Sequence, residues 1–346
     1  MRIVQTVAVV LLVVVAALVG FLYKGDLPKE MVDAKYTNEA SRFLVMPNGA
    51  RVHYRDEGNP NGQPVVLIHG SNASLHTWEP WVTLIGKQYR LISLDLPGHG
   101  LTGRVPDDDY SSAAFINTVS AVVDKLGVEA FVLGGNSMGG GVTWQYALAH
   151  PDRVQALLLI DASGLPAWWQ DREAAAEPED GEAREAPLAF QLLGQPWFRS
   201  IARYLDPFML VEQGLRSAYN NSPVVNEALV TRYYELSLRE GTRDATMKRF
   251  GGFNRGTGQN YDLSRITQPT LIMWGAQDAL IPVQTAERFQ AAIPGSTVVI
   301  YEDLGHIPME EDPARSAADV VAFLTAAGLG PAPAVEAPAS QESDSE

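Results

Sequence analysis

The sequence predicts an α/β fold: a mostly parallel sheet with helices on both faces and an inserted helical cap. The first observation is that short apolar runs alternate with helical patterns, which implies parallel strands joined by crossover helices. The second is that this alternation stops between Leu165 and Tyr261 and resumes at Thr270. With 346 residues, the chain is long enough for one large domain that carries such an insertion.

The amino-terminal segment is strongly apolar. Val7–Tyr23 is an uninterrupted apolar run, and Ile3–Tyr23 reaches the roughly 20 residues that span a bilayer. A signal peptide usually has a shorter apolar region followed by an Ala-x-Ala cleavage site, whereas Ala16 and Ala17 are adjacent here. We therefore expect residues 1–23 to form an uncleaved, single-pass transmembrane anchor, with a cleaved signal peptide as the alternative.

The charges that flank this segment give only a weak indication of its orientation. Arg2 precedes the segment, and Lys24, Lys29 and Lys35 follow it, so the charge bias is mixed. If the segment is a signal anchor, the folded domain lies outside the cytoplasm. Residues 24–40 are then expected to be a short polar tether that holds the domain near the membrane surface.

The first part of the core is expected over residues 41–164. Two strands, Arg42–Met46 and Ala50–Tyr54, are joined by the turn sequence Pro47-Asn48-Gly49. Apolar strands then alternate with helical patterns. These later elements are strands at Val65, Leu91 and Phe131 and helices over Ser112–Leu126 and Met138–His150.

A helical cap is expected over residues 165–262, where the alternation stops. Within it, 174–187 is rich in Ala, Glu and Pro and is expected to be mobile. Residues 188–210 carry many large apolar side chains, which we expect to pack the cap against the core, with contact to a membrane or substrate as the alternative. The core resumes over 263–327, and 328–346 is predicted to be a disordered acidic tail.

A glycine-flanked serine follows one of the core strands. The apolar run Phe131-Val132-Leu133 leads into Gly135-Asn136-Ser137-Met138-Gly139, where a helical pattern begins. Glycines two residues before and after the serine remove side chains that would collide in a tight strand-to-helix turn. Such a turn exposes the hydroxyl beside the positive end of the helix. Ser137 is therefore the candidate nucleophile.

A serine needs a base and an orienting acid, which in sheets of this kind follow in the order Ser, Asp or Glu, His. The predicted strand Thr270–Trp274 leads to Asp278. The predicted strand Val298–Tyr301 leads to His306. Both side chains thus follow carboxyl ends of strands, where open α/β sheets bind their ligands. We expect Asp278 to be the acid and His306 the base, with Asp161, after the preceding core strand, as the alternative acid.

Backbone donors for an oxyanion are expected at a second strand end. The apolar strand Pro64–Ile68 ends in His69-Gly70-Ser71, a glycine turn whose next amides can point inward. The N–H groups of Ser71 and Met138 are the candidate oxyanion donors, and Asn72 is the alternative if the turn is offset by one residue. Another glycine turn, Asp95–Gly100, is expected to be structural.

Composition excludes several other classes of protein. The formal charge of −15 argues against nucleic-acid binding, which needs a basic patch. The absence of Cys excludes disulfides, a thiolate nucleophile and cysteine metal sites. The six histidines are too scattered for a zinc cluster, and no dinucleotide fingerprint or P-loop occurs. We therefore expect no cofactor, no metal and no nucleic-acid partner, and nothing in the sequence indicates an obligate protein partner.

From Ser41 to Leu324 the chain resembles the α/β-hydrolases. The motifs that carry the resemblance are His69-Gly70, Asp95–Gly100, Gly135–Gly139, Trp274–Asp278 and Gly305-His306. The resemblance implies an α/β-hydrolase fold with an eight-stranded sheet. It also implies that Ser137 is the nucleophile, Asp278 the acid and His306 the base. The two implied oxyanion donors are Ser71 and Met138. Dehalogenases and epoxide hydrolases of the same fold carry an aspartate where this chain has its serine, which argues against both activities.

Two hydrolytic functions fit these motifs. Gly135–Gly140 and the amino-terminal segment resemble membrane-anchored bacterial lipases and esterases of the monoacylglycerol-lipase type, which implies a small hydrophobic carboxylic ester as substrate. The alternative is a carbon–carbon hydrolase of the meta-cleavage type, which shares Asn136–Gly140 and needs a buried cap arginine for its anionic substrate, with Arg199 and Arg203 as candidates. A non-catalytic binding module is the third possibility, but such a module would be expected to lack part of the Ser-Asp-His set.

Overall fold

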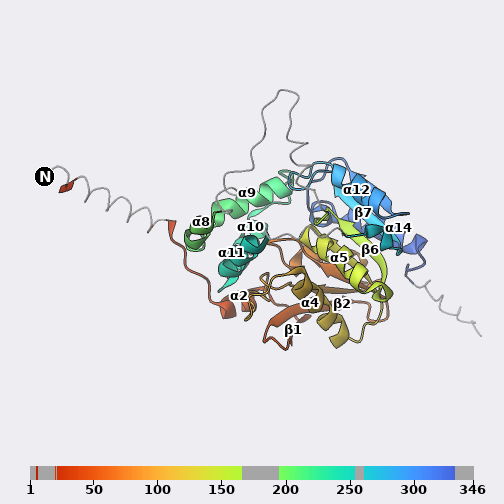
Figure 1. Ribbon diagram of the computed structural model, residues 1–346, viewed down its shortest axis with the longest axis horizontal. Coiled ribbons are helices and arrows are strands. Elements are labelled where there is room, and N and C mark those ends of the chain that lie inside the picture. Colours follow the sequence, from red (N-terminus) through yellow and green to blue (C-terminus); the bar gives the residue numbers. More distant parts are fainter. Residues whose placement is uncertain (1–4, 7–19, 21, 166–194, 254–260, 332–346) are drawn as a thin grey trace, which may run out of the picture.

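The computed structural model describes residues 5–6, 20, 22–165, 195–253 and 261–331 (Figure 1). A single sheet lies at its centre. Its strands are β1 (Ser41–Val45), β2 (Arg51–Gly58), β3 (Gln63–Ile68), β4 (Tyr89–Leu94), β5 (Phe131–Asn136), β6 (Val154–Ile160), β7 (Thr270–Gly275) and β8 (Thr297–Tyr301).

The sheet has eight strands in the order β1-β2-β4-β3-β5-β6-β7-β8. Strand β2 runs antiparallel to both of its neighbours, β1 and β4, and every other pair is parallel. Strands β1 and β2 therefore form a hairpin at one edge. Strand β4 lies on one side of β3, and β5 to β8 follow one another on the other side. This topology confirms the predicted mostly parallel, eight-stranded α/β fold.

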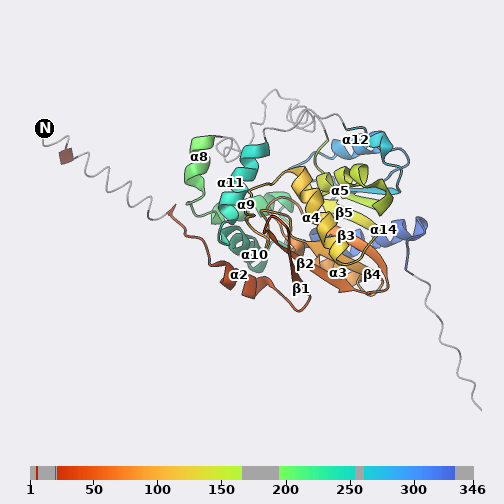
Figure 2. The same cartoon turned by 60° about the horizontal axis from the view of Figure 1, so that its bottom comes forward.

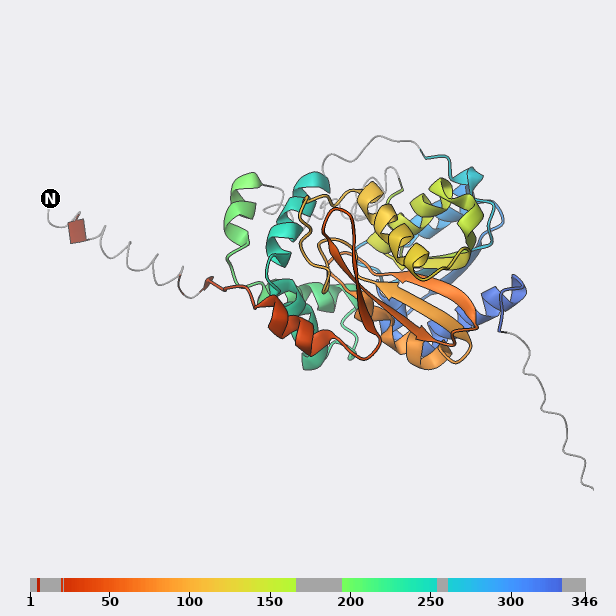
Figure 3. The ribbon, with the colours of Figure 1, turned by 90° about the horizontal axis from the view of Figure 1, so that it is seen from below.

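Helices cover both faces of the sheet (Figures 1 and 3). The core helices are α3 (Glu79–Ile85), α4 (Ser112–Lys125), α5 (Met138–Ala149), α12 (Gln284–Ala292), α13 (Pro308–Glu311) and α14 (Pro313–Ala326). Helices α4, α5 and α12 share one buried apolar cluster, and α3 and α14 share another. The structure thus has the helix–sheet–helix layers that the alternating sequence pattern predicts.

Strand β3 illustrates why its sequence forms a central strand. Val66 and Ile68 belong to the cluster with α4 and α5, whereas Val65 and Leu67 belong to the cluster with α3 and α14. All four side chains are fully buried. Successive side chains of a strand point to opposite faces, so a continuous apolar run is stable only where both faces are covered.

The cap consists, in its described part, of α8 (Pro196–Ala202), α9 (Phe208–Ala218), α10 (Glu227–Leu238) and α11 (Thr242–Phe253). These helices lie together beside one end of the core (Figures 1 and 2). Leu215, Leu229 and Val230 of α9 and α10 join the apolar cluster that contains α3 and α14. Burial of these side chains holds the cap on the core.

The apolar side chains of α8 and the start of α9 differ from the expectation. We expected this part of the cap to pack against the core, but most of its large apolar residues are exposed, and Phe198 and Leu205 are half-buried. The exposed residues are Trp197, Ile201, Tyr204, Phe208, Met209 and Leu210. Residues 188–194 of the predicted segment lie outside the described residues, and in the described part of the cap the apolar positions buried against the core lie on α9 and α10.

The predicted tether over residues 24–40 contains a helix, α2 (Lys29–Tyr36), that docks on the cap and core (Figure 3). Val32 is buried with Leu101 of the core and Leu236 of the cap. The Asp33 carboxylate accepts hydrogen bonds from Arg239 Nε at 2.7 Å and from Arg51 Nη1 at 2.9 Å. This segment is therefore part of the folded domain rather than a free linker, because its partners lie far along the chain.

Several predictions fall on residues outside the described part of the chain. These are most of the anchor over 1–23, the segment 174–187 and nearly all of the tail over 328–346. Among the residues that are described, no helix has the length and apolar character needed to cross a membrane.

Candidate active site

Ser137 lies at the turn between β5 and α5, as the sequence predicts. Its backbone has φ +55° and ψ −119°, a conformation that side-chain-bearing residues rarely adopt. Strain of this kind costs on the order of 1–3 kcal/mol and persists where the surrounding structure enforces it. The turn holds Ser137 at the carboxyl end of the central strand, where the first helical turn of α5 begins.

Close backbone approach explains the glycines around this turn. A Cβ on Gly135 would lie 2.4 Å from the Gly139 carbonyl group. A Cβ on Gly139 would lie 2.3 Å from the carbonyl oxygen of Ile68 in β3. Real Cβ atoms do not approach backbone atoms this closely, so only glycine fits at either position without displacing the strand or the helix.

His306 and Asp278 form a hydrogen-bonded pair. His306 Nδ1 lies 2.6 Å from Asp278 Oδ2, and both side chains are buried. The other carboxylate oxygen of Asp278 accepts hydrogen bonds from the amides of Leu280 and Ile281. These bonds fix the carboxylate, which in turn orients the imidazole and leaves Nε2 as the second ring nitrogen available for proton transfer.

The loop that carries His306 is tied to the serine turn. Asn136, the residue before Ser137, donates its side-chain Nδ2 to the backbone oxygen of His306 at 2.9 Å. The His306 amide donates to the carbonyl oxygen of Ala218 at the end of cap helix α9. His306 is thus anchored to both the serine turn and the cap. No local sequence pattern indicates this contact of Asn136, because the bond joins segments 170 residues apart.

Asp161, the alternative acid, lies beside the same pair. Ligand atoms of Asp161, Asp278 and His306 all fall within 4.8 Å of one another. Asp161 Oδ1 accepts a hydrogen bond from the Gly275 amide. Burial is the main reason that the pKa of Asp161 lies well above its usual value, and the nearby Asp278 charge raises it further. The direct bond to the imidazole belongs to Asp278.

The two candidate oxyanion donors come from adjacent elements. Met138 is the first residue of α5, where a helix has no internal acceptor for its amide. Ser71 follows β3, and the preceding Gly70 lies so close to the elbow that a Cβ there would be 3.2 Å from Ser137 Cβ. The alternative donor, Asn72, has a φ of +59° in the same turn.

A cap arginine lies against these oxyanion residues. Arg249 of α11 donates from Nη1 to Ser71 Oγ at 2.7 Å and from Nη2 to Asn72 Oδ1 at 2.6 Å. Its Nη1 also lies 3.8 Å from Met138 Sδ. Arg249 is only 7% exposed, and burial lowers its pKa to about 10. Within the described residues, no carboxylate lies at ion-pair distance from this guanidinium.

The arginines named from the sequence do not occupy this position. Arg203 is 42% exposed and pairs with Asp244 on the cap. Arg199 of α8 is also not buried. The buried cap arginine is instead Arg249, for which the sequence offers no signal, because its burial depends on how α11 packs over the β3 turn.

A buried acidic group joins the cap to the core close to the base. Glu310 of α13 accepts hydrogen bonds from Thr77 Oγ1 at 2.5 Å, Arg232 Nη2 at 3.2 Å and Tyr233 Oη at 3.4 Å. Burial raises the pKa of Glu310, with the Arg232 charge acting in the opposite direction. The contact joins α10 of the cap to the helix that directly follows the His306 loop.

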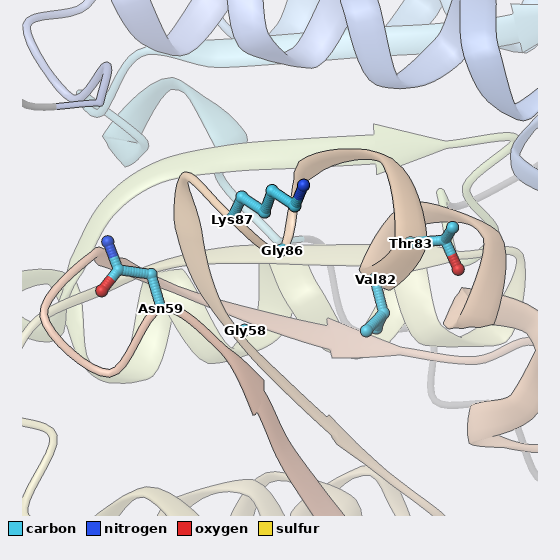
Figure 4. Close-up of a pocket in the computed structure, with 6 residues that line it drawn as sticks. All are labelled: Gly58, Asn59, Val82, Thr83, Gly86 and Lys87. Atoms are coloured by element: carbon cyan, nitrogen blue, oxygen red, sulfur yellow. The ribbon is translucent and has the colours of Figure 1, made fainter. Parts of the chain in front are cut away.

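A surface hollow of about 420 Å³ lies on another part of the molecule (Figure 4). It lies between the ends of β2 and α3 and is lined by Gly58, Asn59, Val82, Thr83, Gly86 and Lys87. None of the predicted site residues lines it. The hollow therefore has no part in the candidate active site.

Comparison with known proteins identifies relatives with different activities. The chain is 25% identical to Lipase 1 of Psychrobacter immobilis, over 82% of this chain and 83% of the relative. It is 28% identical to 2-hydroxy-6-oxononadienedioate/2-hydroxy-6-oxononatrienedioate hydrolase of Klebsiella pneumoniae, over 77% of this chain and 89% of the relative. Among solved structures, it resembles a membrane phospholipase A described as a bacterial virulence factor, with 25% identity and a TM-score of 0.67. The similarity covers 95% of this chain and 99% of that structure.

The sequence pattern of one family also matches most of the core. The match to the alpha/beta hydrolase fold runs over residues 63–313, which includes the serine turn, the acid and the base. It agrees with the eight-stranded sheet and with the hydrolases among the relatives. The chain therefore belongs to the α/β-hydrolase fold family.

Proposed function

We propose that the protein is a serine hydrolase that cleaves carboxylic esters with hydrophobic acyl chains. The observation that carries this proposal is the His306–Asp278 pair, which Asn136 ties to the strained Ser137 turn. A nucleophile, a base held in one orientation and nearby backbone donors are the groups that acyl transfer requires. The likeness to a lipase and to a phospholipase supports an ester substrate.

The proposed reaction proceeds in two halves. His306 Nε2 takes the proton of Ser137 as its oxygen attacks the ester carbonyl, and the amides of Ser71 and Met138 bind the resulting oxyanion. The bond to the alcohol oxygen then breaks as His306 returns the proton to that oxygen. A water molecule, deprotonated by His306, attacks the acyl-enzyme and releases the carboxylic acid and the serine hydroxyl. Asp278 stabilises the imidazolium in both halves.

A second candidate function is supported by Arg249. A buried guanidinium without a described carboxylate partner favours an anionic group on the substrate. This agrees with a carbon–carbon hydrolase acting on a ketone acid, the activity named for the Klebsiella relative. The same triad would then cleave a carbon–carbon bond next to a carbonyl group. A non-catalytic binding module receives no such support, because Ser137, Asp278 and His306 are all present.

The test compares the two substrate classes on one preparation. Purified full-length protein is assayed with p-nitrophenyl esters of increasing acyl length and, in parallel, with a meta-cleavage dienoate. The ester proposal predicts that kcat/KM is highest for an ester and that Ser137→Ala removes turnover, while Ser200→Ala on the exposed surface of α8 leaves it unchanged. A preference for the dienoate would overturn the ester assignment in favour of the second candidate.

We also propose that residues 1–23 anchor the protein in a membrane, with the hydrolase domain outside the cytoplasm. The apolar run Val7–Tyr23 supports this proposal. The likeness to a protein named a membrane phospholipase A, over 95% of this chain, also supports it. Membranes from cells that express the full chain are washed with alkaline carbonate, and the protein is expected to remain in the pellet. Recovery in the soluble fraction would contradict the anchor. Protease treatment of intact cells then tests on which side the domain lies.

A further inference from the structure

Exposed apolar side chains are concentrated on one part of the described molecule. Apart from Met31, Val45 and Leu84, the large exposed apolar residues lie on α8, on the start of α9, in the loop between them or at residues 22–23. We call this set the α8–α9 apolar face: Leu22, Tyr23, Trp197, Ile201, Tyr204, Phe208, Met209 and Leu210. Contiguous exposed apolar surface is unusual on a soluble domain and indicates an interaction site.

Backbone pairing brings the two parts of this face together. Tyr23 and Leu205 form an antiparallel bridge, supported by a bond from the Lys24 amide to the Tyr204 oxygen at 2.9 Å. The Asp206 amide also donates to the Leu22 oxygen at 2.7 Å. The chain that enters the fold at residue 22 therefore runs directly beside the loop between α8 and α9 (Figures 1 and 2).

This pairing identifies what covers the face. The residues immediately before Leu22 belong to the apolar run Val7–Tyr23, whose length matches a bilayer. If that run lies in lipid, the polypeptide leaves the bilayer at residues 22–24, and the loop between α8 and α9 that pairs with these residues is close to the bilayer surface. Trp and Tyr are the residues that favour the boundary between lipid headgroups and acyl chains, and Trp197, Tyr204 and Tyr23 are among them.

The local charge agrees with a lipid surface. The whole chain has a formal charge of −15, yet residues 195–211 contain two arginines, Arg199 and Arg203, and one acid, Asp206. Asp206 accepts hydrogen bonds from Tyr234 Oη and from the Phe208 amide. Arg203 also pairs with Asp244, but the segment carries less negative charge than the chain as a whole, so anionic lipid repels it less.

We propose that the α8–α9 apolar face lies in the headgroup region of a lipid bilayer, as a second membrane contact beside the amino-terminal segment. The side chains of Ile201 and Met209 insert among the upper acyl chains, while the arginines remain at headgroup level. The proposal rests on the proposed amino-terminal anchor, which the carbonate wash tests separately, and does not depend on whether the site cleaves esters.

The absence of cysteine in the chain makes a site-specific test possible. Single Ile201→Cys and Met209→Cys variants of the full chain carry an environment-sensitive fluorophore and are reconstituted into phosphatidylcholine–phosphatidylglycerol vesicles. Val45→Cys and Leu84→Cys, at exposed apolar positions on β1 and α3, provide matched controls. Quenching by nitroxide-labelled lipid is expected to be several-fold stronger for labels at 201 and 209 than for labels at 45 and 84.

Further variants separate lipid from other occupants of the face. Adding Met209→Glu and Leu210→Glu to the Ile201 label should reduce its lipid quenching, whereas Leu84→Glu should not. Equal quenching at all four positions would overturn the proposal. In the same vesicles, labels at 201 and 209 that are quenched neither by nitroxide-labelled lipid nor by a water-soluble quencher would also overturn it, because protein would then cover them. Such shielding would assign the face to a second copy if it decreases as the ratio of protein to lipid is lowered, and to another part of the same chain if it does not.

Discussion

The carboxyl groups of Asp161 and Asp278 lie next to each other at the ends of β6 and β7, and both are within 4.8 Å of a ring nitrogen of His306. Only Asp278 bonds to the imidazole, at 2.6 Å. Asp161 accepts a hydrogen bond from the Gly275 amide instead, and burial together with the nearby Asp278 charge raises its pKa. The site therefore holds two acids within reach of one base.

This pair predicts a non-additive effect of mutation. Asp278→Asn should lower kcat strongly, because the imidazolium loses its partner, but a residual activity should remain in which Asp161 takes over that role. Asp161→Asn alone should have a small effect, whereas in the Asp278→Asn background it should remove the residual activity. Steady-state kinetics of the two single variants and the double variant measure this coupling. A double variant as active as Asp278→Asn would exclude the substitute role for Asp161.

Arg249 predicts a difference between neutral and anionic substrates. Arg249→Gln removes a buried cation beside the oxyanion residues. If the guanidinium binds an anionic group, kcat/KM for an ester with a carboxylate near the scissile bond should fall roughly 10- to 100-fold more than for a neutral ester, since hydrogen bonds to charged groups contribute about 1.5–3 kcal/mol. Equal losses on both substrates would instead indicate that Arg249 only holds the Ser71 turn in place.

Glu310 predicts a pH-dependent contribution to stability. Burial raises its pKa, so the folded protein keeps this proton at a pH where the unfolded chain has released it. The stabilisation is complete below the unfolded pKa of about 4.3 and is lost as pH rises through the folded value. The Tm of wild type minus that of Glu310→Gln should therefore decrease from pH 4 towards neutrality, as measured by circular dichroism. Glu302→Gln, at an exposed position, is the control, and a difference that does not change with pH would contradict the prediction.

Asp33 predicts that α2 stabilises the folded domain. Asp33→Asn weakens the bonds from Arg239 and Arg51, and Arg239 is only 5% exposed, so a nearly buried cation loses its counter-charge. We expect a loss of about 1–3 kcal/mol in the free energy of unfolding, measured in urea. Asp303→Asn, which removes an exposed pair with Arg315, should leave the unfolding midpoint unchanged. Equal midpoints for the two variants would mean that α2 contributes little.

Local sequence patterns were sufficient for the sheet and for the serine turn. A strand such as β3, buried on both faces, reads as a continuous apolar run, and the glycines beside Ser137 are required by contacts within the turn itself. The predicted helix over Ser112–Leu126 matches α4 to within one residue. Its start is marked by Ser111, whose hydroxyl accepts from the Ala114 amide.

The features that the sequence did not reveal depend on contacts between distant segments. Helix α2 has one buried apolar side chain, Val32, and owes its position to Asp33 and its partners in the cap. The burial of Arg249 and the exposure of Trp197 follow from how the cap helices pack. The spacing of apolar residues along each helix does not predict that packing. Chain order predicts Asp278 and His306 as candidate acid and base, and the fold brings their side chains to hydrogen-bond distance.

The docking of residues 22–36 has a mechanical consequence. Residues 22–24 pair with the loop between α8 and α9, Asp26 bonds to Arg243, and Asp33 bonds to Arg239, so most of these attachments are to the cap. A displacement of the chain ahead of residue 22 would therefore act on the cap helices through several bonds, and on the sheet more directly through the bond between Asp33 and Arg51 of β2.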